Sequence, residues 1–196
     1  PLPSIYIYYQ EFSLFGESRK YVRKGFVSMV KIDTQSGNAD SDIVLHEGTI
    51  AASVADRSRL LAQSLLNVAP THGLYHDPSF RLEALMDAYM DHPMHHYVDY
   101  QGVVNKFALV QDRRDIAIFQ EVIARGQIFL ADGHHRLASS VELLRQAQAA
   151  GTALPQDSML NYHMMFLSNL HADDLRILPI HRVWELPDKT FNPNPI

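Results

Sequence analysis

Residues 127–150 constrain the fold of this chain more than any other stretch, because the periodicity of the apolar residues changes there within a few positions. Residues 128–131, Ile-Phe-Leu-Ala, form a short apolar run that is typical of a buried strand. Apolar residues then recur at helical spacing, at Leu137, Val141, Leu143 and Leu144. The stretch therefore predicts a strand that leads through a very short turn into a helix.

The predicted turn consists of Asp132, Gly133, His134, His135 and Arg136. A helix that begins directly after a strand leaves its first backbone N–H groups unpaired at the positive end of its dipole, so an anion can bind there. Gly133 has no side chain to keep a ligand from the backbone, Arg136 offers planar donors suited to phosphate or carboxylate, and the histidines can transfer a proton near neutral pH. The alternative is that Asp132 caps the helix while the other polar side chains are simply solvated.

A second polar cluster follows another short apolar run, at residues 43–45. His46, Glu47 and Thr49 place an imidazole, a carboxylate and a hydroxyl just beyond the end of this predicted strand. Such a set can supply a general base, its orienting partner and a contact to a ligand. Ordinary loop polarity is the competing interpretation, because so short a motif is weak evidence by itself.

Three further positions offer cations to the same ligand. Arg23 lies in a predicted strand, Arg57 lies near the start of a predicted helix, and His181 with Arg182 ends a predicted strand near the C-terminus. Each has a plain structural alternative, since cations on strands and helices are usually solvated. Arg57 in particular either reaches the site or belongs to a surface pair near Asp56.

The composition excludes several classes of function. The 196 residues include 17 basic and 22 acidic ones, and a formal charge of −5 argues against a nucleic-acid partner. The chain has no cysteine, which excludes disulfides, thiolate metal sites and cysteine nucleophiles. No apolar stretch is long enough for a membrane helix, so we expect a cytoplasmic protein without a membrane partner. His92, His95 and His96 surround Pro93, which spoils a regular helix, and zinc binding there is not favoured.

The remaining pattern predicts one mixed α/β domain, an α+β arrangement of a mixed sheet with flanking helices. Strands are predicted at 5–9, 22–32, 43–45, 97–100, 103–110, 128–131, 161–167 and 176–183. Helices are predicted at 55–66, 80–91, 113–125 and from the 132–136 turn to about 150, with loops at 34–42 and 70–78. Leu60, Leu61 and Leu65 share one face of the first helix. The domain spans 1–196 with a linker-like tail at 187–196, and we expect a fragment of a longer chain.

The segment Leu130-Ala-Asp-Gly-His-His-Arg136 closely resembles the signature of domain-of-unknown-function family 1015. Further elements agree in the same order: Arg23-Lys-Gly-Phe26, His46-Glu-Gly-Thr49, Asp56-Arg57, Asn67 with Pro70, and Leu178-Pro-Ile-His-Arg182. The chain departs from the family pattern directly after the signature, where Leu137-Ala-Ser-Ser140 replaces a Tyr-Glu-Thr-Ala run. The resemblance implies a ParB/sulfiredoxin-like core, related to that of free serine kinases, around the strand–turn–helix unit.

This resemblance implies a phosphotransferase that acts on a small hydroxyl compound such as free serine, with a nucleotide or pyrophosphate as donor. Glu47 with His46 would act as the base, and Asp132 would bind Mg²⁺ or stabilise the motif itself. A larger set of residues would contact the phosphorylated small molecule: Gly133, His134, His135, Arg136, Arg23, Thr49, Arg57, His181 and Arg182. No Walker-type loop is present to hold the donor. A non-catalytic nucleotide or phosphometabolite sensor and a metal-dependent phosphohydrolase remain alternatives, and we leave open whether the chain forms a homo-oligomer.

Overall fold

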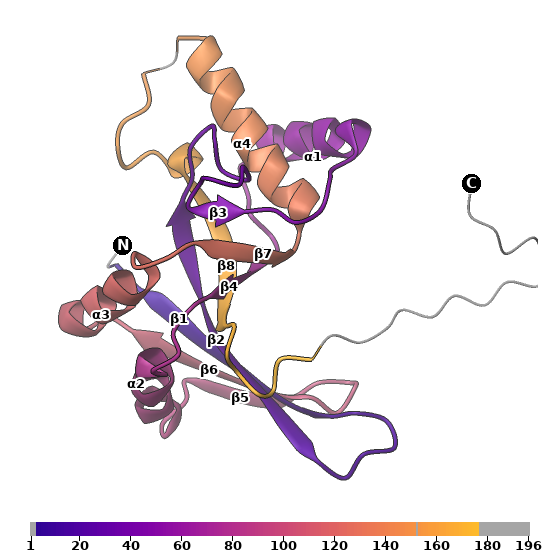
Figure 1. Cartoon of the computed structure of the whole chain (residues 1–196), viewed down its shortest axis with the longest axis vertical. Coiled ribbons are helices and arrows are strands. Elements are labelled where there is room, and N and C mark those ends of the chain that lie inside the picture. The colour runs from indigo at the N-terminus through magenta and orange to yellow at the C-terminus, as the bar shows by residue number, and fades with distance from the viewer. Residues whose placement is uncertain (1–2, 152, 177–196) are drawn as a thin grey trace, which may run out of the picture.

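The computed structural model describes residues 3–151 and 153–176, which form an eight-stranded mixed sheet with four helices (Figure 1). The sheet order is β3-β7-β4-β8-β2-β1-β6-β5. The strands are β1 (Ile5–Ser13), β2 (Lys20–Lys31), β3 (Ile43–Val44), β4 (Thr71–Tyr75), β5 (His95–Val98), β6 (Val104–Val110), β7 (Ile128–Asp132) and β8 (Tyr162–Asn169). The helices are α1 (Ala51–Ser64), α2 (Arg81–Met90), α3 (Arg113–Ile123) and α4 (His134–Ala149). The predicted α/β class is confirmed, whereas the strand predicted at 176–183 lies almost wholly outside the described residues.

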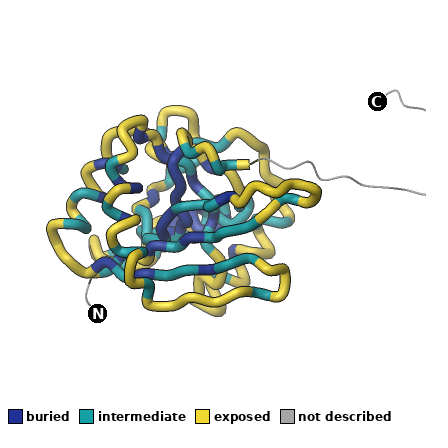
Figure 2. Tube along the Cα trace, turned by 90° about the horizontal axis from the view of Figure 1, so that it is seen from below, coloured by how far each residue is buried: buried dark blue, intermediate teal, exposed yellow. Residues whose placement is uncertain are grey.

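One face of the sheet forms the core. Ile5, Ile7 and Tyr9 alternate along β1 as buried residues, while Tyr6 between them is 52% exposed. These side chains belong to one apolar cluster with residues of α2, α3 and α4, and the buried segments lie at the centre of the molecule in Figure 2. Leu137, Val141 and Leu144, the residues whose spacing predicted α4, are all buried in this cluster. The spacing of apolar residues in the sequence therefore predicts correctly which side of this helix packs into the core.

The predicted loop at 70–78 is wrong in its first half, because residues 71–75 form the strand β4. This strand is central: it pairs antiparallel with β7 and parallel with β8. Gly73, which suggested a turn, is required by close packing, since a Cβ atom there would lie 2.7 Å from Ile128 Cγ2 and 2.8 Å from Leu167 Cδ2. In this strand glycine marks a close approach of neighbours rather than a change of chain direction.

Helix α1 also differs from its prediction. It begins at Ala51, four residues earlier than expected, and ends at Ser64, where the C-cap residue Leu65 is left-handed with φ 53°. Leu60 and Leu65, which share one face of the predicted helix, are 61% and 76% exposed and do not pack into the core. Instead α1 packs against α4, where the buried Ser58 hydroxyl donates to the carbonyl oxygen of Ser139 at 3.2 Å. Among the described residues, no helix is long and apolar enough to cross a membrane.

Candidate functional site

Two strand–turn–helix units lie side by side at one edge of the sheet. β3 and β7 are parallel neighbours, with Ile43 opposite Ile128, so their carboxyl ends meet at the same edge. β3 leads through residues 45–50 into α1, and β7 leads through Gly133 into α4. The first turns of both helices therefore start beside each other, beyond the right-hand ends of β3 and β7 in Figure 1. The predicted strand–DGHHR–helix unit is confirmed as local structure.

Gly133 makes the abrupt entry into α4. Its φ of 94° lies in the left-handed region, and it has no side chain with which to cap the helix. The first N–H groups of α4 consequently lack the capping acceptor that most helices provide at this position. A Cβ atom at residue 133 would lie 2.6 Å from Thr71 Cγ2 on β4, so the turn is pressed closely against the sheet.

His135 connects the two helix N-termini. Its Nε2 atom accepts a hydrogen bond from the backbone N–H of Ile50, the N-cap residue of α1, at 3.0 Å. The contact fixes the start of α1 next to the first turn of α4. The positive ends of two helix dipoles thus converge on one small region of the surface.

His134 faces the cluster that follows β3. Its ring stands edge-to-face against the ring of His46, with centroids 4.7 Å apart, and its Nδ1 atom lies 3.6 Å from Glu47 Oε2. The His134 side chain is only 6% exposed, whereas that of Glu47 is 68% exposed. Burial, and then the neighbouring His46, lower the pKa of His134, which favours its neutral form. The two polar clusters predicted from distant parts of the sequence therefore meet.

Asp132 and Arg136 hold the turn together. Arg136 Nη2 donates to Asp132 Oδ2 at 2.6 Å, and Nη1 donates to the carbonyl oxygens of Pro70 at 2.7 Å and Ala69 at 3.3 Å. These contacts tie the start of α4 to the segment that enters β4. The alternative that Asp132 caps α4 is not supported, because no side chain caps this helix. Asp132 instead forms an ion pair one turn along the helix.

Arg57 reaches the region of the turn rather than pairing with Asp56. Asp56 is bound by Arg59, at 3.3 Å. Arg57 instead lines a cavity of about 240 Å³ between α1, α4 and the segment before β4, together with Arg136 and His163. Two arginines and three serines thus line one small hollow together with Leu60, Leu61 and Leu66, and its volume suits a small compound better than a whole nucleotide.

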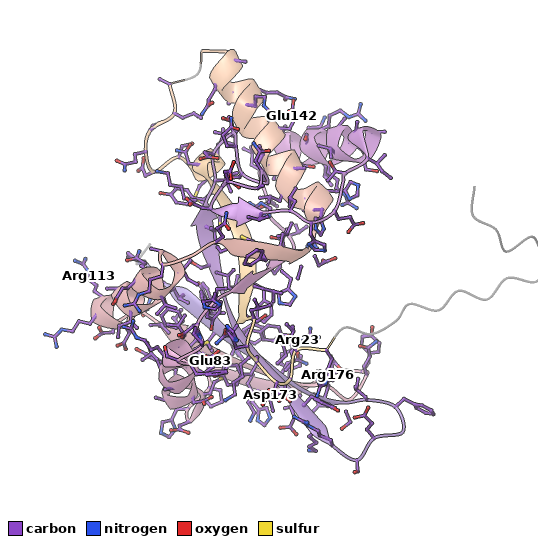
Figure 3. All side chains as sticks on the ribbon, in the orientation of Figure 1. Arg23, Glu83, Arg113, Glu142, Asp173 and Arg176 are labelled. Carbon is purple, nitrogen blue, oxygen red and sulfur yellow. The ribbon has the colours of Figure 1, made fainter. Side chains whose placement is uncertain are left out.

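The other predicted site residues lie elsewhere. Thr49 lines a separate cavity of about 620 Å³ along α1 and α4. Arg23 lies on β2, over the lower part of the sheet in Figure 3, where its Nη1 atom donates to Gln10 Oε1 at 3.2 Å and its buried Nε atom has no partner among the described residues. His181 and Arg182 fall outside the described residues. The candidate site is therefore formed by the 46–50 segment and the first turns of α1 and α4.

Comparison with known proteins identifies the family of this chain. The model of a protein family of unknown function, DUF1015, matches residues 1–193. The chain belongs to the DUF1015 family. No curated protein matches the chain, and no solved structure matches it.

In this DUF1015 protein, the helix residues after the turn have a structural role that the sequence analysis missed. Ser139 and Ser140 are buried, and the Ser140 hydroxyl lies 2.8 Å from Nδ1 of His163 on β8. The Nε2 atom of His163 lies 3.2 Å from the hydroxyl oxygen of Thr71 on β4. Burial, and then the charge of Arg136, lower the pKa of His163 to about 4. A buried, neutral histidine therefore joins α4 to two strands directly behind the turn.

Proposed function

We propose that this DUF1015 protein binds a phosphorylated ligand at the edge formed by β3 and β7, and that it transfers a phosphoryl group to a small hydroxyl compound. The observation that carries the proposal is the hydrogen bond from Ile50 N–H to His135 Nε2, which brings two helix N-termini to one place. Uncapped N–H groups at such termini bind phosphate oxygens through hydrogen bonds and through the helix dipole.

The donor is a nucleotide or pyrophosphate, and its terminal phosphate lies at the first turn of α4. Glu47 is exposed beside this turn and acts as the base. The acceptor oxygen forms a bond to the terminal phosphorus, the bond from phosphorus to the leaving diphosphate or phosphate breaks, and the acceptor proton passes to Glu47. Mg²⁺ would accompany the donor, and Asp132 could contact it only by sharing its ion pair with Arg136.

The acceptor occupies the cavity between α1 and α4. Its volume of about 240 Å³ suits a molecule of amino-acid size. Arg57 and Arg136, which line it, would attract both a carboxylate of the acceptor and the phosphate bound next to the cavity. The expected relation of the family to the free-serine-kinase branch of the ParB/sulfiredoxin group makes serine the first acceptor to test. A metal-dependent phosphohydrolase is the second candidate, because His46, Glu47 and His134 place three potential metal ligands at the same edge.

Thermal unfolding with ATP, ADP and pyrophosphate, each with and without Mg²⁺, tests the phosphate site. A ligand at 100 times its Kd stabilises the folded chain by about 2.7 kcal/mol, which raises the midpoint by about 5–10 °C for a domain of this size. We expect such a rise with at least one ligand, and a smaller rise in the Arg57→Gln and Arg136→Gln variants because a cation near the phosphate is lost.

Arg59→Gln is the matched control, since Arg59 lies on the same helix but pairs with Asp56. It should retain the full rise. Arg57 is exposed and forms no such pair among the described residues, so Arg57→Gln should fold even if Arg136→Gln does not. No rise with any ligand, or an unchanged rise in Arg57→Gln and in a folded Arg136→Gln protein, would contradict the proposed phosphate site.

A further inference from the structure

His46, Glu47 and His134 offer three metal-binding atoms in one place. One ligand atom from each residue lies within 4.8 Å of the others. His134 is held in the first turn of α4 with its side chain 6% exposed, and its buried Nε2 atom has no hydrogen-bond partner among the described residues. His46 and Glu47 belong to the exposed segment between β3 and α1. The cluster thus combines one fixed imidazole with two side chains that are free to adjust.

We propose that these three residues bind a transition-metal ion of the Zn²⁺, Co²⁺ or Mn²⁺ class. Imidazole nitrogen is a ligand that such ions accept readily, whereas Mg²⁺ and Ca²⁺ prefer oxygen ligands alone. Ligand atoms that share a tetrahedral zinc ion at about 2.0–2.2 Å lie roughly 3.3 Å apart. The largest separation of 4.8 Å closes to this value through side-chain rotation of the two exposed residues.

Three protein ligands leave at least one coordination position for water or for another oxygen. Catalytic zinc sites have this arrangement, whereas structural zinc sites are closed by four protein ligands. The open position would lie beside the first turn of α4, where the phosphate is proposed to bind. The role of the ion in phosphate chemistry rests on the proposed function, while its binding to the three side chains does not. Glu47 would offer the ion one carboxylate oxygen, so its other oxygen would remain to accept the proton in the proposed transfer.

Two other histidines, outside the proposed cluster, could bind the same ions. His76 and His171 lie with Nδ1 and Nε2 2.9 Å apart, and their rings are 4.6 Å apart between centroids. No carboxylate joins them in a potential metal cluster among the described residues. Two ligands bind a borderline metal more weakly than three, so we assign the tighter site to the cluster at α4.

Titration of the whole chain with Co²⁺ and Zn²⁺, without any nucleotide, tests this site. Calorimetry gives the stoichiometry and affinity, and the visible absorption of Co²⁺ reports its ligands. We expect one tight ion per chain, at least about 10-fold weaker binding in the Glu47→Gln and His46→Ala variants, and weaker binding still in His134→Ala. His96→Ala and His76→Ala should keep the wild-type affinity. Mg²⁺ should not displace Zn²⁺ at equal concentration.

No tight ion in the wild-type chain would overturn the inference. Unchanged affinity in both Glu47→Gln and His46→Ala, or a loss in His76→Ala instead, would overturn it as well. These two exposed positions keep the test decisive even if the buried His134→Ala variant does not fold. Because the titration contains no phosphate ligand, failure of this site is distinguishable from failure of the proposed phosphate site, which is measured by the ligand-induced rise of the unfolding midpoint.

Discussion

Gly133→Ala should destabilise the folded chain by about 2–5 kcal/mol and abolish phosphate binding. A non-glycine residue in the left-handed region costs about 1–2 kcal/mol, and the φ of 94° lies beyond the centre of that region. The added Cβ atom would also lie 2.6 Å from Cγ2 of Thr71, a fully buried residue on a central strand, and 2.9 Å from Arg136 Nη2. Relief of this overlap costs a further 1–3 kcal/mol, approximately, and displaces the turn from β4.

Urea unfolding of the wild-type and variant chains measures this loss, and pyrophosphate binding to the folded variant measures the functional effect. Gly126→Ala is the control, because a Cβ atom there would have no neighbour within 4 Å and residue 126 has no positive φ. Its stability should stay within about 1 kcal/mol of the wild type. Equal stability of Gly133→Ala and Gly126→Ala would contradict the close contact between the turn and β4.

Lowering the pH from 7 to 4 should reduce the free energy of unfolding by several kcal/mol. Burial, and then the charge of Arg23, lower the pKa of His72 from 6.5 to about 4. Asp132 acts in the opposite direction but does not offset them. His163 shows a similar pKa of about 4. In the unfolded chain both histidines titrate near 6.5. Between pH 6.5 and 4 the unfolded chain therefore binds more protons than the folded chain, so stability falls as the pH falls and levels off, for these two groups, below pH 4.

Each lowered pKa corresponds to a loss of about 3 kcal/mol in the free energy of unfolding between pH 7 and pH 4. For both histidines together we expect a loss of roughly 5 kcal/mol, because the structure around the partly exposed His72 can relax. A loss of this size is comparable to the whole stability of many domains. Urea unfolding at intervals from pH 7 to pH 4 measures it. A His163→Gln variant should lose about 3 kcal/mol less over the same range, whereas the exposed His96→Gln should behave as wild type. The same pH dependence in all three chains would show that His163 does not titrate as proposed.

The local elements could be predicted because their signals are contained in short stretches of sequence. The apolar run 128–131 and the spacing of Leu137, Val141 and Leu144 predict β7 and α4 without reference to any distant residue. The sequence also predicts correctly that polar residues lie at the ends of β3 and β7. Their contact, shown by the 3.6 Å between His134 and Glu47, depends on parallel pairing of these strands, which the sequence does not specify.

The errors arise where neighbours that are distant in sequence decide the structure. Gly73 resembles a turn residue, yet it lies in a strand because Ile128 and Leu167 leave no room for a side chain. Leu60 and Leu65 resemble a core face, yet α1 packs on α4 through Ser58 and leaves both leucines exposed. His163 gives no signal in the sequence, because its role depends on Ser140 and Thr71 on two other elements.

The measurement that tests the central proposal most directly is transfer of labelled phosphate from ATP or pyrophosphate to serine by the whole chain. We predict labelled phosphoserine in the wild type with Mg²⁺ present, and a loss of at least about 100-fold in Glu47→Gln because the base is removed. Arg59→Gln should retain the wild-type rate. Release of labelled inorganic phosphate without phosphoserine would favour the hydrolase instead. Stabilisation by the ligands with no turnover, for serine and for other small hydroxyl compounds, would contradict phosphoryl transfer and leave a phosphate-binding sensor.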